Sequence, residues 1–246
     1  MIKLGIGLPA YGSKLDVGHA AMWLGFGAAL LEARDKVTLT MFTEYHINGI
    51  DLCRNTIMYD AMQAGCDWVL MIDADTFHRT TGANGVCDAI GDAGVDIVQM
   101  IRDADRGKIA VEVDEGDFIL RPIQLAPTDK GIALIGAPVR GRGVGDVGVC
   151  VQHHDGSQIP LAKLAGEVQK VWRIGGACIA VNLNWFREYW PKGPWFEMEH
   201  DYEARPKNAR GEDYSICDGI WKRSGAVVCD GRFVPSHVDR RRLVGE

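Results

Sequence analysis

The pattern of apolar and polar positions predicts an α/β architecture for the first 100 residues. Apolar and β-branched runs at 2–8, 37–42 and 68–72 are typical of strands. Residues 16–34 and 51–64 instead carry apolar side chains at helical spacing. Strands that alternate with helices in this way form a parallel sheet with helices on both faces.

The pattern changes after a further helical stretch at 85–93. Four short β-like runs follow, separated by Asp-Gly and Gly-rich turns that favour antiparallel pairing. The runs cover residues 109–113, 118–125, 132–139 and 147–153. A helix at 213–224 and a strand at 226–229 are expected near the end of the chain. The second half is therefore expected to be built differently from the first.

Two carboxylates come directly after the apolar strand at 68–72. Ligands of parallel sheets bind beyond the carboxyl ends of the strands, which is where Asp73 and Asp75 fall. Two carboxylates, together with phosphate oxygens and water, are enough to bind Mg²⁺. Asp75 with Thr76 could instead cap a helix or turn. A haloacid-dehalogenase-type phosphatase also ends a strand in D-x-D, but that family has Thr or Val where Phe77 stands here.

A second acidic pair, Glu212 and Asp213, lies at the expected start of the last helix. Acidic side chains in a first helical turn are stabilised by the helix dipole, so a structural role is one interpretation. The other interpretation is a general base for an acceptor hydroxyl, placed at a loop–helix junction about 140 residues after Asp73.

Composition is that of an ordinary globular protein and restricts the function only slightly. The 246 residues are 47% hydrophobic and 24% charged, and no apolar run approaches the ~18 residues needed to span a bilayer. The net charge of −6 disfavours a general nucleic-acid binder, although residues 140–142 and 240–242 are locally basic. Seven scattered cysteines without a C-x-x-C pair indicate reduced thiols, and we expect a cytoplasmic protein.

The order of several motifs makes the chain resemble a GT-A glycosyltransferase, of the type represented by the large family 2 and its small bacteriophage relatives. The matching segments, in chain order, are Pro9 to Tyr11, Arg54 with Asn55, residues 65–75, 174–178, 194–196 and 211–214, and His237. Their colinearity over residues 9–237, rather than any single motif, carries the resemblance.

The resemblance implies a single GT-A domain over 1–246. Residues 1–100 would form the nucleotide-binding half and 101–246 the acceptor-side half. Residues 103–130 look like an insertion, because the distance from the D-x-D strand to the glycine pair exceeds what a minimal member of this fold needs. The adjacent pair His153 and His154 is interpreted as hairpin structure, because neighbouring side chains on a strand point to opposite faces.

The resemblance also implies how a nucleotide-sugar donor, with a UDP-sugar favoured, would be held. Pro9 and Tyr11 would lie against the nucleotide base. Arg54 would meet the nucleotide or its phosphates, which suits the forked donors of a guanidinium. Trp195 would either stack on a sugar or base, or lie in the core.

Mn²⁺ or Mg²⁺ is the implied cofactor. Asp75 would bind the metal on the diphosphate, Asp73 would hold the ribose or a metal-bound water, and His237 would be a third ligand. The pair Gly175 and Gly176 would let the backbone approach the donor sugar closely.

In the same resemblance Asp213 is the base that deprotonates the acceptor, with Glu212 orienting the acceptor or sharing the role. A base on the face opposite the leaving diphosphate implies inversion at the anomeric carbon. The acceptor stays open: a hydroxylated DNA base of phage type and a saccharide both fit.

Two alternatives stay open beside glycosyl transfer. A sugar nucleotidyltransferase normally carries a Gly-rich loop with Arg and Lys after its first strand, and residues 9–14 lack the glycine run. A non-catalytic nucleotide-sugar binding module would keep the fold without turnover, but the acidic residues Asp73, Asp75 and Asp213 are all present, as is His237.

Overall fold

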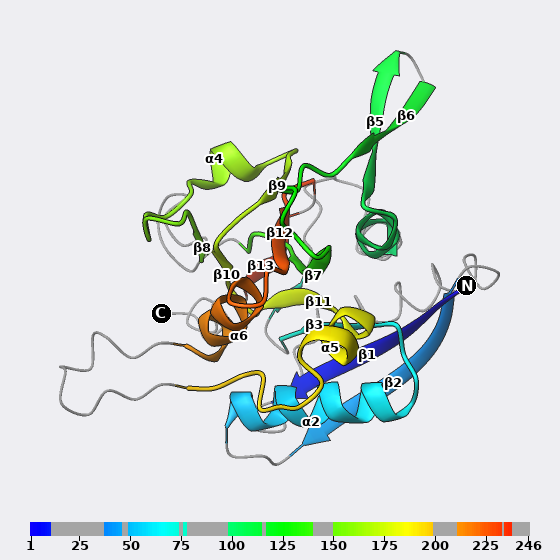
Figure 1. Cartoon of the computed structure of the whole chain (residues 1–246), viewed down its shortest axis with the longest axis vertical. Coiled ribbons are helices and arrows are strands. Elements are labelled where there is room, and N and C mark those ends of the chain that lie inside the picture. The colour runs from blue at the N-terminus through cyan, green and yellow to red at the C-terminus, as the bar shows by residue number, and fades with distance from the viewer. Residues whose placement is uncertain are drawn as a thin grey trace, which may run out of the picture.

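A central sheet organises the part of the chain that the structure, a computed structural model, describes (Figure 1). The described residues are 1–10, 37–45, 49–73, 76–77, 98–114, 117–139, 150–198, 211–232 and 234–237. The helices expected at 16–34 and 85–93 lie outside these residues.

The central sheet has seven strands in the order β2-β1-β3-β11-β7-β12-β9. They are β1 (Ile2–Ala10), β2 (Val37–Tyr45), β3 (Trp68–Ile72), β7 (Ile132–Gly136), β9 (Val168–Lys170), β11 (Cys178–Asn182) and β12 (Ala226–Asp230). β1 is parallel to β2 and β3, and β7 is parallel to β12. β11 is antiparallel to β3 and β7, and β9 is antiparallel to β12. Five strands therefore have their carboxyl ends on the same side of the sheet: β1, β2, β3, β7 and β12.

The elements expected before residue 73 are confirmed where they are described. β1, β2, β3 and the helix α2 (Ile50–Gln63) cover the four predicted ranges. α2 lies close on β1 because Gly7 has no side chain, and an added Cβ there would overlap Ile57. The glycines within the first strand thus serve helix–sheet contact.

Two hydrophobic cores lie on opposite faces of the sheet. On one face, α2, α5 (Leu183–Tyr189) and α6 (Glu212–Trp221) pack against side chains such as Met71 of β3. On the other face, the helical residues 98–106 pack against side chains such as Leu70. A strand buried on both faces has a continuous apolar sequence, as β3 does. This mixed sheet with helices on both faces confirms the predicted α/β class.

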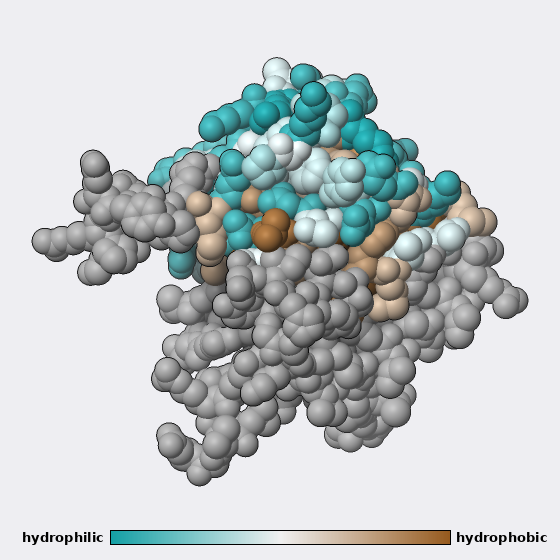
Figure 2. Space-filling view, turned by 90° about the horizontal axis from the view of Figure 1, so that it is seen from below, coloured by the Kyte–Doolittle hydropathy of each residue, from teal (hydrophilic) through white to brown (hydrophobic). Residues whose placement is uncertain are grey.

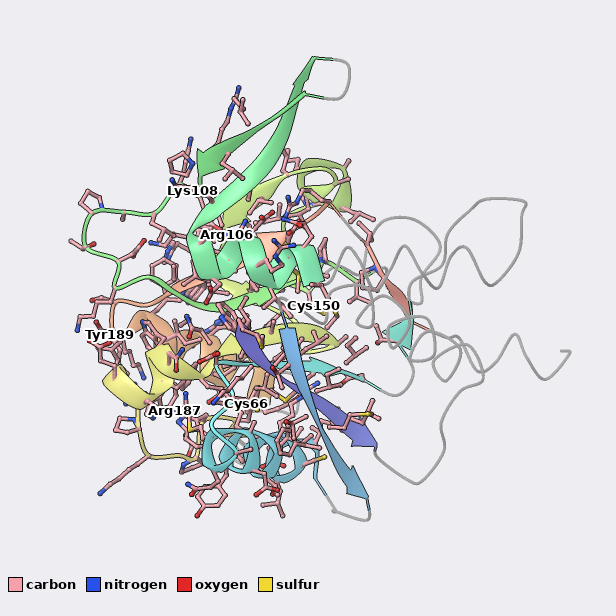
Figure 3. The ribbon with its side chains drawn as sticks, turned by 90° about the vertical axis from the view of Figure 1, so that its right-hand side faces the viewer. Cys66, Arg106, Lys108, Cys150, Arg187 and Tyr189 are labelled. Atoms are coloured by element: carbon pink, nitrogen blue, oxygen red, sulfur yellow. The ribbon has the colours of Figure 1, made fainter. Side chains whose placement is uncertain are left out.

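Helix α5 is joined to the end of α2 by Arg187. Its guanidinium donates to the carbonyl oxygens of Cys66 (2.8 Å) and Met62 (3.1 Å), and Figure 3 shows Arg187 beside Cys66. The last carbonyls of a helix lack partners within the helix, and a cation satisfies them well. This contact fixes the segment that leads into β3.

The remaining strands and the short helix α4 lie outside the central sheet. They are β4 (Thr76–Phe77), β5 (Lys108–Asp114), β6 (Asp117–Pro122), β8 (Val151–Gln152), α4 (Leu161–Leu164), β10 (Arg173–Ile174) and β13 (Ser236–His237). Within the described part, β5 and β6 pair only with each other, and they extend from the body as a hairpin (Figure 1). This hairpin lies within residues 103–130. The expectation of antiparallel pairing holds for β5 with β6 and for β8 with β10. β7 is antiparallel to β11 on one side, as expected, and parallel to β12 on the other.

The Asp-Gly turn expected after β8 is confirmed. The N–H of His153 donates to the carbonyl oxygen of Ser157 (2.9 Å), and Gly156 has a left-handed φ of 83°. The ring of His154 lies edge-on to that of Trp221, with 4.3 Å between the centroids. Both histidines thus belong to a hairpin, as the sequence predicted.

The described surface in Figure 2 is mainly hydrophilic, with scattered apolar side chains. Exposed apolar side chains on α2 include Leu52 and Tyr59. Among the described helices, none has both the length and the apolar character needed to cross a membrane.

Candidate functional site

A pocket of about 150 Å³ opens at the carboxyl ends of β3 and β7. Its described lining has four charged side chains, Arg54, Asp73, Glu212 and Asp213. These come from α2, from the residue after β3 and from the start of α6. The backbone of the glycine pair before β11 lines it as well. The two acidic segments that the sequence singled out therefore meet at one pocket.

Asp73 stands where β3 ends. Its N–H donates to the carbonyl oxygen of Ala177 (2.9 Å), the last backbone bond between β3 and the segment before β11. Its side chain is 23% exposed, and Oδ1 accepts a hydrogen bond from Nη2 of Arg54 (2.7 Å).

Arg54 lies beneath the pocket, with a side chain only 2% exposed. Nη1 donates to Oε1 of Glu212, and Nη2 donates to Asp73 and to the carbonyl oxygen of Gly176 (3.0 Å). Burial works to lower the pKa of Arg54, but the charges of Asp73 and Glu212 outweigh burial and raise its pKa. The guanidinium is therefore a permanent cation between two carboxylates.

Gly176 leaves the room that this guanidinium occupies. An added Cβ would lie 2.7 Å from Cζ of Arg54, closer than two unbonded carbons approach. Gly175 serves Cys150 in the same way, since an added Cβ would lie 2.8 Å from the Cβ of Cys150. The glycine pair thus permits close approach of protein side chains, a role that the sequence did not suggest.

Glu212 and Asp213 begin α6 and have different surroundings. Burial raises the pKa of Glu212, Arg54 opposes that effect, and the charge of Asp213 adds to it. Oδ2 of Asp213 accepts the N–H of Gly176 (3.2 Å), and Oδ1 accepts the N–H of Tyr214 (2.8 Å). Asp213 is therefore held by backbone donors, whereas Glu212 is held by a guanidinium.

The expected metal ligands fall at the border of the described residues. Asp75 lies outside them, and so does Tyr11. β4 begins directly after Asp75 and pairs with β13, in which the backbone of His237 stands opposite Thr76. Within the described residues no three His, Cys, Asp or Glu side chains gather as a metal site. The chain thus brings the backbone of His237 next to the D-x-D segment, although the two are about 160 residues apart in sequence.

The other expected donor residues divide between the sheet edge and the core. Pro9 is near the end of β1, which runs parallel to β3 toward the same edge as Asp73. Trp195 is 4% exposed, does not line the pocket and donates from its indole N–H to the carbonyl oxygen of Trp190 (2.9 Å). The structure therefore places Trp195 in the core, one of the two alternatives left open by the sequence.

Two residues near the pocket were not among the expected site residues. Asn55 accepts the N–H groups of Trp195 (2.8 Å) and Phe196 (3.1 Å) and donates to the carbonyl oxygen of Phe196 (2.7 Å). Cys150 lines the pocket, and burial with the nearby charge of Asp213 raises its pKa. For Asn55 the sequence did hold a usable signal, since it directly follows Arg54 in the helix before the D-x-D strand. Cys150 carried none, because it precedes a strand of two residues.

No family model and no curated protein sequence matches the chain. Similar solved structures include A197 from STIV, with a TM-score of 0.48, 10% identity, and coverage of 97% of this chain and 86% of that one. A glycosyltransferase involved in glycosylation of the major capsid of PBCV-1 has a TM-score of 0.43 and 10% identity, with coverage of 96% of this chain and 93% of that one. Mannose-1-phosphate geranyltransferase from Thermus thermophilus has a TM-score of 0.42 and 11% identity, with coverage of 96% of this chain and 76% of that one. At this level of similarity no residue role is transferred to the chain.

Proposed function

We propose that this chain is a metal-dependent glycosyltransferase that moves a sugar from a nucleotide-diphosphate sugar to an acceptor hydroxyl. The observation that supports it best is the meeting of Asp73 with Glu212 and Asp213 at one pocket beyond the carboxyl end of a central strand. Three carboxylates face one guanidinium among the charged side chains that line this pocket. Such an excess of negative charge suits a site completed by a cation.

The residues proposed to hold the metal are Asp73, Asp75 and His237. Carboxylate and imidazole donors suit Mn²⁺, and carboxylates with water suit Mg²⁺. The exposed fraction of Asp73 and the pairing of His237 with Thr76 fit this assignment. When bound, the metal would offset the charge that develops on the leaving diphosphate.

Asp213 is the proposed base. Its carboxylate borders the pocket, and its two oxygens accept the N–H groups of Gly176 and Tyr214, which orient it. Glu212 is engaged by Arg54 and is assigned to orientation rather than proton transfer. Deprotonation of the acceptor on the side opposite the diphosphate would give inversion at the anomeric carbon.

On the donor side, Pro9 and Tyr11 are proposed to contact the base, and the backbone at Gly175 and Gly176 to border the donor sugar. A UDP-sugar is the favoured donor. A saccharide or a hydroxylated DNA base is proposed as acceptor, the latter with help from the basic residues 140–142 and 240–242, which lie outside the described part.

The test is donor hydrolysis measured across UDP-, GDP- and other nucleotide sugars, with Mn²⁺, with Mg²⁺ and with a chelator. We expect turnover of at least one donor that is lost when the metal is removed. Turnover that survives the chelator would refute metal dependence, and no turnover of any donor would refute the transferase.

The base is tested by Asp213→Asn, which keeps the size of the side chain. We expect nucleotide binding to persist while transfer falls by about 10²- to 10⁴-fold. Asp155→Asn is the matched control, because Asp155 lies in the exposed hairpin turn and Asn is accepted in such turns. Full activity of Asp213→Asn would remove Asp213 from this role.

A further inference from the structure

We propose that Arg54 is a positioning residue, which sets Asp73 and Glu212 in place and leaves Asp213 as the carboxylate available for proton transfer. This inference rests on the proposed glycosyl transfer. It departs from the expectation that Arg54 binds the nucleotide sugar, because the protein itself engages three of the five N–H groups of this guanidinium.

The hydrogen bonds of Arg54 leave little for a ligand. A guanidinium has five N–H donors. Three of them serve Glu212, Asp73 and the carbonyl oxygen of Gly176. A fourth, on Nε, is buried and has no partner among the described residues. With one Nη1 hydrogen left and 2% of the side chain exposed, Arg54 has almost no surface to present to a diphosphate.

The same contacts tie together four separate parts of the chain. Arg54 is on α2, Asp73 follows β3, Gly176 precedes β11 and Glu212 begins α6. A planar guanidinium that bridges two carboxylates fixes both distance and direction, which a flexible ammonium does not. The position of α6 relative to β3, and with it the distance from Asp213 to Asp73, therefore depends on Arg54.

The next residue on α2 extends this arrangement to the other side of Arg54. Asn55 holds the backbone of Trp195 and Phe196 through three hydrogen bonds. The ring of Phe196 lies 5.7 Å from Cζ of Arg54, within the range of a cation–π contact. The guanidinium is thus enclosed by an aromatic ring, two carboxylates and the glycine backbone. Such an enclosure holds the guanidinium in one place at the lining of the pocket.

The decisive variant is Arg54→Lys, which keeps the charge but cannot bridge two carboxylates in one plane. We expect kcat for donor hydrolysis to fall by about 10²-fold, since small displacements of a reacting group have effects of that size. The KM for the donor should change by less than about twofold, and the Kd values for UDP and GDP measured by calorimetry should also be maintained. A donor ligand would behave in the opposite way, with weaker nucleotide binding.

The matched control is Arg232→Lys. Arg232 also bridges two buried carboxylates, Asp230 (2.6 Å) and Asp103 (2.9 Å), but it does not line this pocket. Its replacement should lower the Tm and leave kcat of the folded protein unchanged. If Arg54→Lys and Arg232→Lys lost kcat to a similar extent, the loss in Arg54→Lys would be explained by lower stability of the protein, and the inference would be overturned.

A second measurement does not depend on turnover. Arg54→Met should lower the Tm strongly because it leaves the buried carboxylate of Glu212 and the half-buried carboxylate of Asp73 without a cation. Adding Glu212→Gln should recover part of that loss, so the double variant should lose less than the sum of the single losses. If wild-type protein turns over no donor, the proposed function fails while this coupling still tests Arg54. Additive losses, or nucleotide binding lost in Arg54→Lys at unchanged kcat, would overturn the positioning role.

Discussion

Replacing Gly176 by Ala should show how tightly the site is packed around its cation. The φ of Gly176 lies outside the left-handed region, so alanine brings no backbone strain and acts only through its Cβ. That atom would lie 2.7 Å from Cζ and 2.8 Å from Nη2 of Arg54. The guanidinium cannot swing away as a free side-chain end would, because Asp73 and Glu212 hold it.

The expected loss follows from two effects. Overpacking of a well-packed interior costs about 1–3 kcal/mol, and weakening one hydrogen bond to a charged group costs about 1.5–3 kcal/mol. We therefore expect the free energy of unfolding to fall by about 3 kcal/mol for Gly176→Ala. For a protein of this size that corresponds to a Tm lowered by about 6–12 °C.

The assay is thermal and urea unfolding followed by circular dichroism, with donor hydrolysis measured on the same samples. The control is Gly176→Ala in an Arg54→Met background, where the neighbour that the alanine meets has been removed. The added loss there should be small. An equal loss in both backgrounds, or a wild-type Tm for Gly176→Ala alone, would refute the contact between Gly176 and the guanidinium.

Two further outcomes are expected. Asn55→Ala removes three hydrogen bonds to the backbone of Trp195 and Phe196, so the free energy of unfolding measured in urea should fall by about 3 kcal/mol. The control is Asn184→Ala at an exposed position, which should change the free energy of unfolding by under about 0.5 kcal/mol. Burial raises the pKa of Cys217 from 9.0 to about 12, so its thiol should resist iodoacetamide at pH 8 in folded protein and react once unfolded, as read by mass spectrometry. The stability that comes from burying this thiol in its protonated form is present in full below pH 9 and is lost as the pH rises through about 12. Alkylation of Cys217 in folded protein at pH 8 would contradict the raised pKa.

The described elements before residue 73 were predictable because they are long or strongly apolar. β3 is buried on both faces, and a continuous run such as 68–72 has few other interpretations. α2 has 14 residues with its apolar side chains at helical spacing. Local sequence and tertiary packing agree in these elements, so neither has to override the other.

The central strand β11 and the helix α5 were not predicted. β11 has five residues and runs directly into α5, where Asn182 accepts the N–H of Trp185 (3.2 Å) as an N-terminal cap. No separate turn lies between the two elements, so the sequence shows no loop that would mark the boundary between strand and helix. Such short elements are stabilised by their neighbours, here β3 and β7, rather than by their own propensity.

The site was predictable in its parts but not in its contacts. Sequence order indicated that Asp73 and Asp213 belong to one site, and both line the pocket. The ion pair between Arg54 and Glu212 joins residues 158 positions apart, and no local pattern encodes it. Trp195 was ambiguous for a related reason, since an aromatic residue after a proline serves a core as readily as a ligand.

The charge balance of the pocket links its architecture to the cation that we propose. Arg54 can neutralise only one of the three carboxylates that line the described part, so a nucleotide diphosphate would approach a site with an excess of two negative charges. At about 4 Å and an effective dielectric constant near 20, each such like-charge contact costs about 4 kcal/mol, more than one hydrogen bond to a charged group returns. A divalent cation would cancel this excess of two negative charges. Because Arg54 is already committed to Asp73 and Glu212, it cannot substitute for the metal, and a donor that bound equally well without metal would need its countercharge from a different part of the chain.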